Sequence, residues 1–313
     1  MTEPALFGRD LFGHAIKPKP SGPVADRFCV PPFSILDTRQ GDWIERRRAW
    51  VAMGLKSDDG RGEVLFTSGG AQDFDHYRHA NGERETSAER TTSIFDPLLC
   101  ELAYRWFCPT GGQVVDPFAG GSVRGIVAGA LGRSYWGCDL RPEQIAANEA
   151  QADAIEPPVR PVWVCGDSID TLDGAPDADF VFSCPPYGDL EVYSDNPRDL
   201  SNMEHHTFIA AYKRIILRAV RKMKPDTFAC FVVGDFRDSR GFYRNFVSDT
   251  ISAFEEAGAR YYNEAILVNS VGTAAMRVTK QFEASRKLAK THQNVLVFCK
   301  GDPKAATAKI TGK

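Results

Sequence analysis

The 313-residue sequence predicts an α/β fold with a doubly wound, mostly parallel sheet that ends in an antiparallel hairpin. Five short apolar runs between residues 114 and 235 are interleaved with helical patterns, as in parallel strands joined by helices. Two more apolar runs, at 264–271 and 294–301, are joined by a basic connection that requires no helix, which is typical of a strand pair. We therefore expect seven strands.

Residues 1–90 are expected to form an N-terminal extension ahead of this sheet. Four prolines among residues 1–27 indicate an extended arm, whereas residues 42–53 predict a short helix with Trp43 and Trp50 facing inward. Residues 67–93 are polar and too numerous for an ordinary connection, which indicates a functional loop that could engage a partner.

The sheet domain is expected over residues 91–300, followed by a flexible tail at 301–313. It opens with a helix over 98–107, because Asp96 is a good N-cap and Pro97 suits the first turn. The five strands of the parallel part are expected at 114–118, 134–140, 162–167, 178–187 and 227–235, with helices at 122–132, 142–155, 203–223 and 246–257.

The composition is that of an ordinary globular protein, with 43% hydrophobic and 25% charged residues and a net charge of −3. No apolar stretch approaches the roughly 18 residues of a membrane span, so we expect no membrane partner and a cytoplasmic location. The eight cysteines form no CxxC pair, which favours reduced core residues and predicts no metal site.

In doubly wound sheets, ligands bind at the carboxyl ends of the strands. Gly120 and Gly121 follow the first strand and would let a ligand approach the backbone, yet the segment is neither GxGxxG nor a P-loop. Asp139 ends the second strand, where a carboxylate can accept from the two hydroxyls of a ribose, and Asp167 ends the third, where it can accept from an adenine amino group. The pattern favours a nucleoside ligand without a pyrophosphate.

These segments, together with TSIFDP (92–97), DPFAGGS (116–122), GDS (166–168) and SCPPY (183–187), resemble a known family. It comprises the S-adenosylmethionine-dependent DNA methyltransferases that modify exocyclic amino groups, N4 of cytosine or N6 of adenine, and the resemblance covers residues 91 to about 300. It implies a Rossmann-like class I methyltransferase fold, S-adenosyl-L-methionine as cofactor and double-stranded DNA as partner. The order of the motifs excludes the circularly permuted members.

The resemblance also implies which residues hold the cofactor. They are Thr92, Ser93, Phe95 and Asp96; Asp116, Pro117, Phe118, Ala119, Gly120, Gly121 and Ser122; Asp139 and Leu140; and Asp167 and Ser168.

The segment Cys184-Pro185-Pro186-Tyr187 is expected to be catalytic. An amino nitrogen on a base is a poor nucleophile, since its lone pair is delocalised into the ring, and acceptors on its two hydrogens draw it toward a reactive tetrahedral geometry. Pro-Pro fixes the backbone and presents carbonyl oxygens without competing N–H donors. Tyr187 can stack on a base that has been flipped out of the duplex.

Cys184 departs from the family, which has Asp, Asn or Ser before Pro-Pro, because a cysteine sulfur is a weak acceptor. Three accounts are open. The Pro185 carbonyl, with Ser183 as a helper, suffices for amino methylation; or Cys184 is a nucleophile that adds to C6 of a pyrimidine for C5 methylation; or the site is degenerate and only binds DNA. Methylation of an RNA base is a further alternative.

The basic residues of the chain are unevenly placed, with nine basic and two acidic residues from 277 to 313. Those in the connection before the last strand fall on the catalytic side of the predicted sheet, where a phosphate backbone would pass. We expect them to contact DNA: Arg277, Lys280, Arg286, Lys287 and Lys290.

Overall fold

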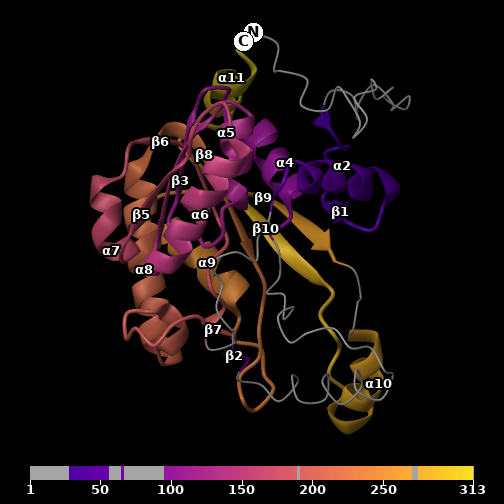
Figure 1. The fold of residues 1–313 in the computed structure, drawn as a ribbon. Coiled ribbons are helices and arrows are strands. Elements are labelled where there is room, and N and C mark those ends of the chain that lie inside the picture. Colours follow the sequence, from indigo (N-terminus) through magenta and orange to yellow (C-terminus); the bar gives the residue numbers. More distant parts are fainter. Residues whose placement is uncertain (1–27, 56–64, 67–94, 189–190, 270–273, 313) are drawn as a thin grey trace.

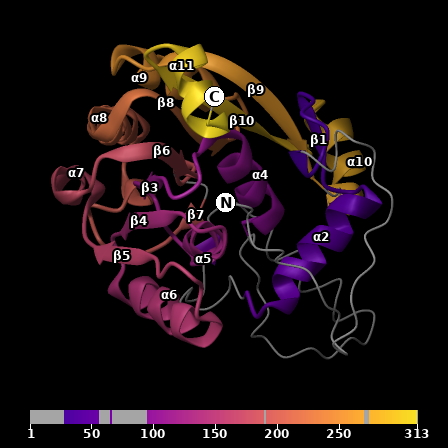
Figure 2. The ribbon, with the colours of Figure 1, turned by 90° about the horizontal axis from the view of Figure 1, so that it is seen from above.

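The computed structural model describes residues 28–55, 65–66, 95–188, 191–269 and 274–312. Its main feature is an eight-stranded sheet in the order β1-β9-β10-β8-β6-β3-β4-β5, with helices on both faces (Figures 1 and 2). The strands are β1 (Ile35–Asp37), β3 (Gln113–Asp116), β4 (Ser134–Asp139), β5 (Val162–Cys165), β6 (Ala178–Ser183), β8 (Met223–Val233), β9 (Arg260–Val268) and β10 (His292–Lys300).

The topology is the one expected for a class I methyltransferase fold. The strands β3, β4, β5, β6 and β8 are parallel. When these five are numbered 1 to 5 in chain order, their order across the sheet is 3-2-1-4-5, as in doubly wound nucleotide-binding sheets. Strand β10 lies antiparallel between β8 and β9, so the C-terminal strand pair is confirmed.

Buried strands place successive side chains in two separate cores. Phe180 and Phe182 pack into one core and Val181 into the other, as the two-residue period of a strand requires. The first core is covered by α4 (Pro97–Phe107), α5 (Val123–Ala130) and α6 (Pro142–Ile155), and the second by α7 (Ser168–Thr171), α8 (His205–Lys222) and α9 (Phe246–Glu256).

The predicted helix caps are confirmed where the sequence is explicit. The Asp96 side chain accepts from the backbone N–H of Leu98 at 2.9 Å, and Pro97 occupies the first turn of α4. The helix predicted over 42–53 is α2 (Gly41–Ala52), with Trp43 and Trp50 buried.

Part of the N-terminal extension belongs to the sheet domain, which corrects the predicted boundary at residue 90. Strand β1 pairs in parallel with β9 as an eighth strand, and α2 packs against α4. The buried carboxylate of Glu101 accepts from Arg46, Trp50 and Arg105 and thereby links α2 to α4. A strand of three residues gives too little pattern for sequence analysis to find it.

The predicted flexible tail is also wrong, because residues Pro303–Thr311 form helix α11. Asp302 caps it by accepting from Lys304 N and Ala305 N, and Ala306 is buried against the rest of the domain. The connection between β9 and β10, for which the sequence predicts no helix, contains α10 (Ala274–Ser285).

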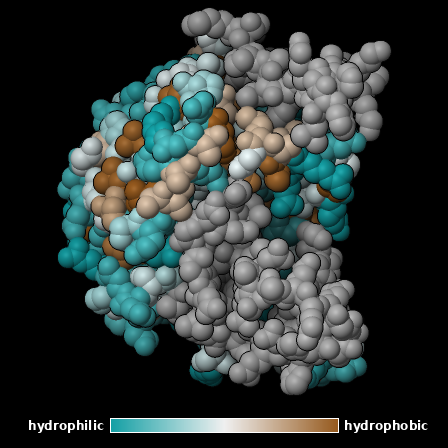
Figure 3. All heavy atoms as spheres, viewed as in Figure 1, coloured by the Kyte–Doolittle hydropathy of each residue, from teal (hydrophilic) through white to brown (hydrophobic). Residues whose placement is uncertain are grey.

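The remaining described elements are small. They are β2 (Leu65–Phe66), which pairs with β7 (Glu191–Val192), and the 3-10 turns η1 (Leu172–Gly174) and η3 (Leu200–Asn202). In the described part of the chain, no helix has both the length and the apolar character needed to cross a membrane. Among the coloured residues in Figure 3, which lie mainly at the left, hydrophilic and hydrophobic residues are interspersed.

Candidate active site

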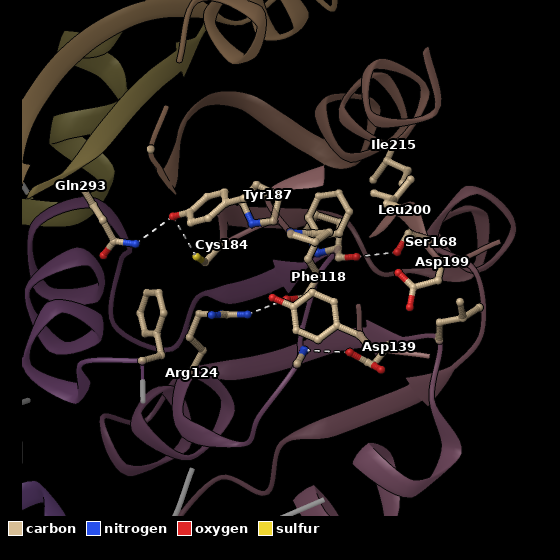
Figure 4. A pocket seen from close by; sticks show the side chains of 18 of the residues that line it. Phe118, Arg124, Asp139, Ser168, Cys184, Tyr187, Asp199, Leu200, Ile215 and Gln293 are labelled. Carbon is tan, nitrogen blue, oxygen red and sulfur yellow. Dashed lines mark hydrogen bonds between the residues drawn. The ribbon is translucent and has the colours of Figure 1, made fainter. Parts of the chain in front are cut away.

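A cavity of about 730 Å³ opens at the carboxyl edge of the sheet. The turns that follow β3, β4, β5, β6 and β8 all contribute to its wall, together with η3, one face of α8 and the start of β10 (Figure 4). Its size lies in the range of pockets that enclose a small organic ligand. The cavity thus brings together the strand ends at which sequence analysis placed the ligand.

The Gly-rich turn after β3 forms one wall through Pro117, Phe118 and Gly120. Gly120 has φ +50°, a conformation that glycine adopts without strain, and its N–H donates to Asp139 Oδ2 at 3.1 Å. Asn148 Nδ2 donates to the carbonyl of Gly120 at 2.7 Å and fixes the other side of the turn. The backbone of the turn is therefore held in one conformation at the cavity wall.

Three other predicted cofactor residues of this turn do not line the cavity. Ala119 is fully buried, and Ser122 is buried and donates its hydroxyl to Gln151 Oε1 at 2.5 Å. Gly121, like these two, is absent from the wall. Of the turn, only Pro117, Phe118 and Gly120 therefore face the cavity.

Asp116, also predicted to hold the cofactor, lies beneath the turn and is fully buried. It accepts from Arg124 Nε at 2.6 Å, Tyr135 Oη at 2.7 Å, Ser183 Oγ at 2.5 Å and Phe118 N at 3.1 Å. Four donors occupy this carboxylate and it is absent from the cavity wall, so in this structure it holds the turn in position.

Arg124, which sequence analysis missed, completes that arrangement. Its Nη2 donates to the carbonyls of Phe118, at 2.5 Å, and Ala119, at 2.9 Å, and its guanidinium lies 4.6 Å from the centre of the Phe95 ring. Burial acts to lower its pKa, but the Asp116 carboxylate, through its charge and its hydrogen bond, and other neighbours together raise the pKa, so the side chain stays charged. The arginine thus connects the turn, Phe95 and the buried aspartate.

Asp139 and Leu140, both predicted to hold the cofactor, lie on the cavity wall. Asp139 Oδ1 accepts from Arg141 N at 2.9 Å and its Oδ2 from Gly120 N, so two backbone groups orient the carboxylate. Each oxygen can accept a second hydrogen bond, which leaves room for a ribose diol. Burial raises the pKa of Asp139, since no cation compensates fully for the lost water.

Asp167 and Ser168 follow β5 and also line the cavity. Asp167 Oδ1 accepts from Ile169 N at 2.8 Å and caps α7, while the other oxygen can still accept from a ligand. Ser168 donates to the carbonyl of Pro117 at 2.5 Å and so joins the β5 turn to the β3 turn. Asp199 of the η3 region, which the sequence did not single out, faces the same cavity.

The Cys184–Tyr187 segment forms the wall at the end of β6. Gln293 Nε2 donates to the Tyr187 hydroxyl at 2.8 Å, and the Cys184 sulfur lies 3.9 Å from that hydroxyl. The Tyr187 ring stacks on Phe236 with centroids 6.4 Å apart. Burial, and then Cys184, raise the pKa of Tyr187, so the phenol keeps its proton. Sequence analysis could not identify Gln293 as a partner of Tyr187, because it lies on β10, 106 residues further along the chain.

Of the predicted residues that precede α4, Phe95 and Asp96 line the cavity. Thr92 and Ser93 lie outside the described residues. The N-terminal part contributes Thr38, which follows β1, and Arg47 of α2, two wall residues that sequence analysis did not predict.

The predicted DNA-contacting residues fall into two groups. Lys290 lines the cavity, and burial lowers its pKa. Lys280 and Arg286 are exposed and Lys287 is half-buried, in or next to α10, which lies away from the helical layers in Figure 1. The side chain of Arg277 is outside what the structure describes.

No disulfide joins the eight cysteines, all of which lie in described residues, and five of them are buried. Among the described residues, no group of three or more His, Cys, Asp or Glu side chains is arranged to hold a metal ion.

No protein-family model and no curated protein matches the sequence. Solved structures with a similar arrangement of elements include a TehB-like SAM-dependent methyltransferase from Corynebacterium glutamicum, at 17% identity over 74% of this chain and 95% of that chain, with a TM-score of 0.41. TrmN from Thermus thermophilus is 15% identical over 85% of this chain and 80% of that chain, with a TM-score of 0.44. Precorrin 8w decarboxylase from Methanobacterium thermoautotrophicum is 12% identical over 69% and 95%, with a TM-score of 0.45. At such low identities these likenesses say nothing about the ligand or reaction of this chain.

Proposed function

We propose that this chain is an S-adenosylmethionine-dependent methyltransferase that acts on the exocyclic amino group of a cytosine or adenine in DNA. One observation carries the proposal: the Gly120–Asp139 pair and the Cys184–Tyr187 segment lie on the walls of a single cavity. The half that we assign to the nucleoside and the half that we assign to the base would thus share the space in which a methyl group would pass.

The residues of the first half fit the cofactor. The Asp139 carboxylate, oriented by two backbone N–H groups, would accept from the ribose hydroxyls, and Asp167 would accept from the adenine amino group. Phe118 lines the cavity, and an aromatic ring there would suit a positively charged sulfur. The cofactor supplies a methyl group bonded to that sulfonium, which makes the methyl carbon electrophilic.

The second half would hold the flipped base. Tyr187 is supported from behind by Phe236, so its ring is fixed as a stacking surface. The Pro185 carbonyl would accept from the amino group and localise the nitrogen lone pair. With the cofactor held by Asp139 and Asp167, the new N–C bond would form at the expense of the methyl–sulfur bond, and one amino proton would pass to water.

DNA is the proposed substrate because cations lie at the base-binding end of the cavity. Lys290 lines the cavity itself, and Lys287 and Arg286 precede it in the chain. Phosphate contacts from such side chains supply most of the affinity for a duplex. Binding should therefore weaken steeply as salt rises.

The test is to titrate S-adenosylmethionine by calorimetry, then incubate the protein with it and duplex DNA, and digest the DNA to nucleosides for mass analysis. We expect N4-methylcytosine or N6-methyladenine. Asp139→Ala should abolish cofactor binding, whereas the control Asp153→Ala, an exposed carboxylate on α6, should not. Failure of the wild-type protein to bind the cofactor would overturn the proposal.

Cys184 decides between amino methylation and C5 methylation. Cys184→Ser should keep its activity if the amino group is the target, because serine is a better acceptor. Loss of turnover, together with covalent trapping of the wild-type protein on DNA containing 5-fluorocytosine, would show instead that the thiol adds to the ring. Methylation of RNA but not of DNA would refute the proposed substrate.

A further inference from the structure

The segment that leaves β8 folds into a tight hairpin over residues 236–244, which we call the 236–244 hairpin. Arg237 and Tyr243 are paired as an antiparallel bridge. Asp238 N donates to the carbonyl of Phe242 at 2.9 Å, Phe242 N donates to Asp238 Oδ1 at 2.8 Å, and Gly241 at the tip has φ +93°. These bonds fix the backbone, so the side chains at the tip are presented by a rigid support.

The hairpin presents two large aromatic side chains to solvent. Phe242 is 65% exposed and Tyr243 46% exposed. Leu288, in the segment before β10, is 69% exposed. A single exposed apolar residue is ordinary, but a rigid aromatic turn costs a protein solubility and suggests that it contacts a partner.

Cations surround these aromatic rings. The guanidinium of Arg240 lies 5.5 Å from the Phe242 ring centre, and that of Arg237 lies 3.9 Å from the Tyr243 ring. Lys290 Nζ lies 5.9 Å from the Tyr243 ring. The Lys287 side chain reaches the hairpin at Gly241, where its amine lies 2.6 Å from the point that a Cβ atom would occupy on that glycine.

The acidic groups of this region are already engaged in the fold. Asp238 accepts from the Phe242 N–H inside the turn, and Asp235 Oδ1 accepts from Val247 N at 3.1 Å. Four cations, Arg237, Arg240, Lys287 and Lys290, outnumber these two carboxylates, so the hairpin region is net basic as well as aromatic. This combination suits a polyanion that also offers flat apolar rings, which is the chemistry of a nucleic acid.

The hairpin begins at the proposed base site. Phe236, its first residue, stacks on Tyr187, and Gly234 and Asp235 line the cavity. A duplex whose flipped base reached Tyr187 would therefore pass over the hairpin. Flipping leaves a gap in the base stack, and apolar side chains can occupy such steps at the expense of stacking energy.

We propose that the 236–244 hairpin is a duplex-DNA contact in which Phe242 inserts into the base stack next to the flipped base, while Arg240 and Lys287 contact phosphates. This inference rests on the proposed function for the identity of the partner. Duplex DNA is favoured over duplex RNA, because a rigid wedge needs base steps that can be reached through a groove and unstacked, and A-form grooves offer this less readily.

The first experiment measures binding of a fluorescein-labelled 40-base-pair DNA of mixed sequence by anisotropy at several salt concentrations. Phe242→Ala should weaken binding about 5- to 100-fold, as expected for loss of one base-stacking contact, without changing the salt dependence. Lys287→Gln should reduce the slope of log K against log salt by about 1. Phe242→Leu should restore binding in part, because leucine also serves as a wedge.

The matched control is Phe33→Ala. Phe33 is 71% exposed, precedes β1 at the end opposite to Thr38 and does not line the cavity, so its removal should leave binding unchanged. A second probe, the same duplex with a run of mismatches, needs less energy for unstacking, so wild-type binding should tighten on it and the loss caused by Phe242→Ala should be at least as large.

Wild-type affinity in Phe242→Ala, or an equal loss of affinity for duplex RNA of the same sequence, would overturn the inference. Cofactor titration separates this result from the proposed function, because Phe242 does not line the cavity and Phe242→Ala should bind S-adenosylmethionine normally. A protein that binds DNA through Phe242 but transfers no methyl group would contradict only the proposed function.

Discussion

The buried pair of Arg124 and Asp116 provides the most direct test of how the cavity is built. Their side chains are 6% and 0% exposed, so Arg124→Met would leave the Asp116 carboxylate buried without a cation. It would also remove the donors to the carbonyls of Phe118 and Ala119. Removing one partner of a buried ion pair costs about 3–5 kcal/mol, and we expect the free energy of unfolding to fall by that amount.

The assay is guanidinium-induced unfolding followed by far-UV circular dichroism, with the slope m compared between variants. The control is Arg160→Met, which breaks exposed pairs with Glu149 and Asp153 at an arginine that is 51% exposed and should cost at most about 1 kcal/mol. The double variant Asp116→Asn/Arg124→Met should cost less than the sum of its single changes, because both remove the same interaction.

A loss below about 1 kcal/mol in Arg124→Met, or strictly additive effects in the double variant, would refute this reasoning. The same variant should bind S-adenosylmethionine more weakly, since the turn that carries Gly120 loses its anchor. Weakened binding with unchanged stability would mean that Arg124 contacts the ligand directly.

Three further predictions concern other parts of the molecule. Burial raises the pKa of Asp139. The cofactor affinity of the wild-type protein, measured by calorimetry, should therefore be highest above that raised pKa and fall as the pH drops through it. Asp139→Asn should bind the cofactor weakly at every pH. Burial acts to raise the pKa of Glu101, but Arg46 and Trp50 outweigh burial and lower the pKa. The attachment of α2 is therefore present above the ordinary carboxylate pKa of 4.5 and is lost in more acidic solution. Glu101→Gln should make residues 28–55 sensitive to protease already at neutral pH. Deletion of residues 302–313 should lower the free energy of unfolding by about 1–3 kcal/mol through loss of Ala306 and Ile310 packing, whereas a free tail would change nothing.

The sequence predicted those parts of the fold whose signals are local. The Asp96-Pro97 start of α4 and the alternation of apolar runs with helices both depend on neighbouring residues. The same Asp-Pro signal at residues 302–303 begins α11, but the short and polar segment that follows gives no apolar pattern to support a helix. Strand β1 was missed because three residues give too little pattern, and its pairing partner β9 is far away in the chain.

The site was predicted to the extent that strand ends define it. Sequence could locate Asp116 and Asp139 at strand ends but not their surroundings, and only Asp139 faces the cavity. The direction of Asp116 is set by Arg124, which comes from the next helix. Gln293, which bonds to Tyr187 across 106 residues, depends on the antiparallel placement of β10. Such contacts depend on the complete topology.

The pairing of β1 with β9 has a consequence for the order of assembly. Thr38, next to β1, donates its hydroxyl to the carbonyl of Val268 at 2.9 Å, across 230 residues of chain. Closing so long a loop is slow, and a growing polypeptide cannot make this contact until β9 has been synthesised. Because Thr38 lines the cavity, a ligand that contacts this part of the wall can bind only after β1 has paired with β9.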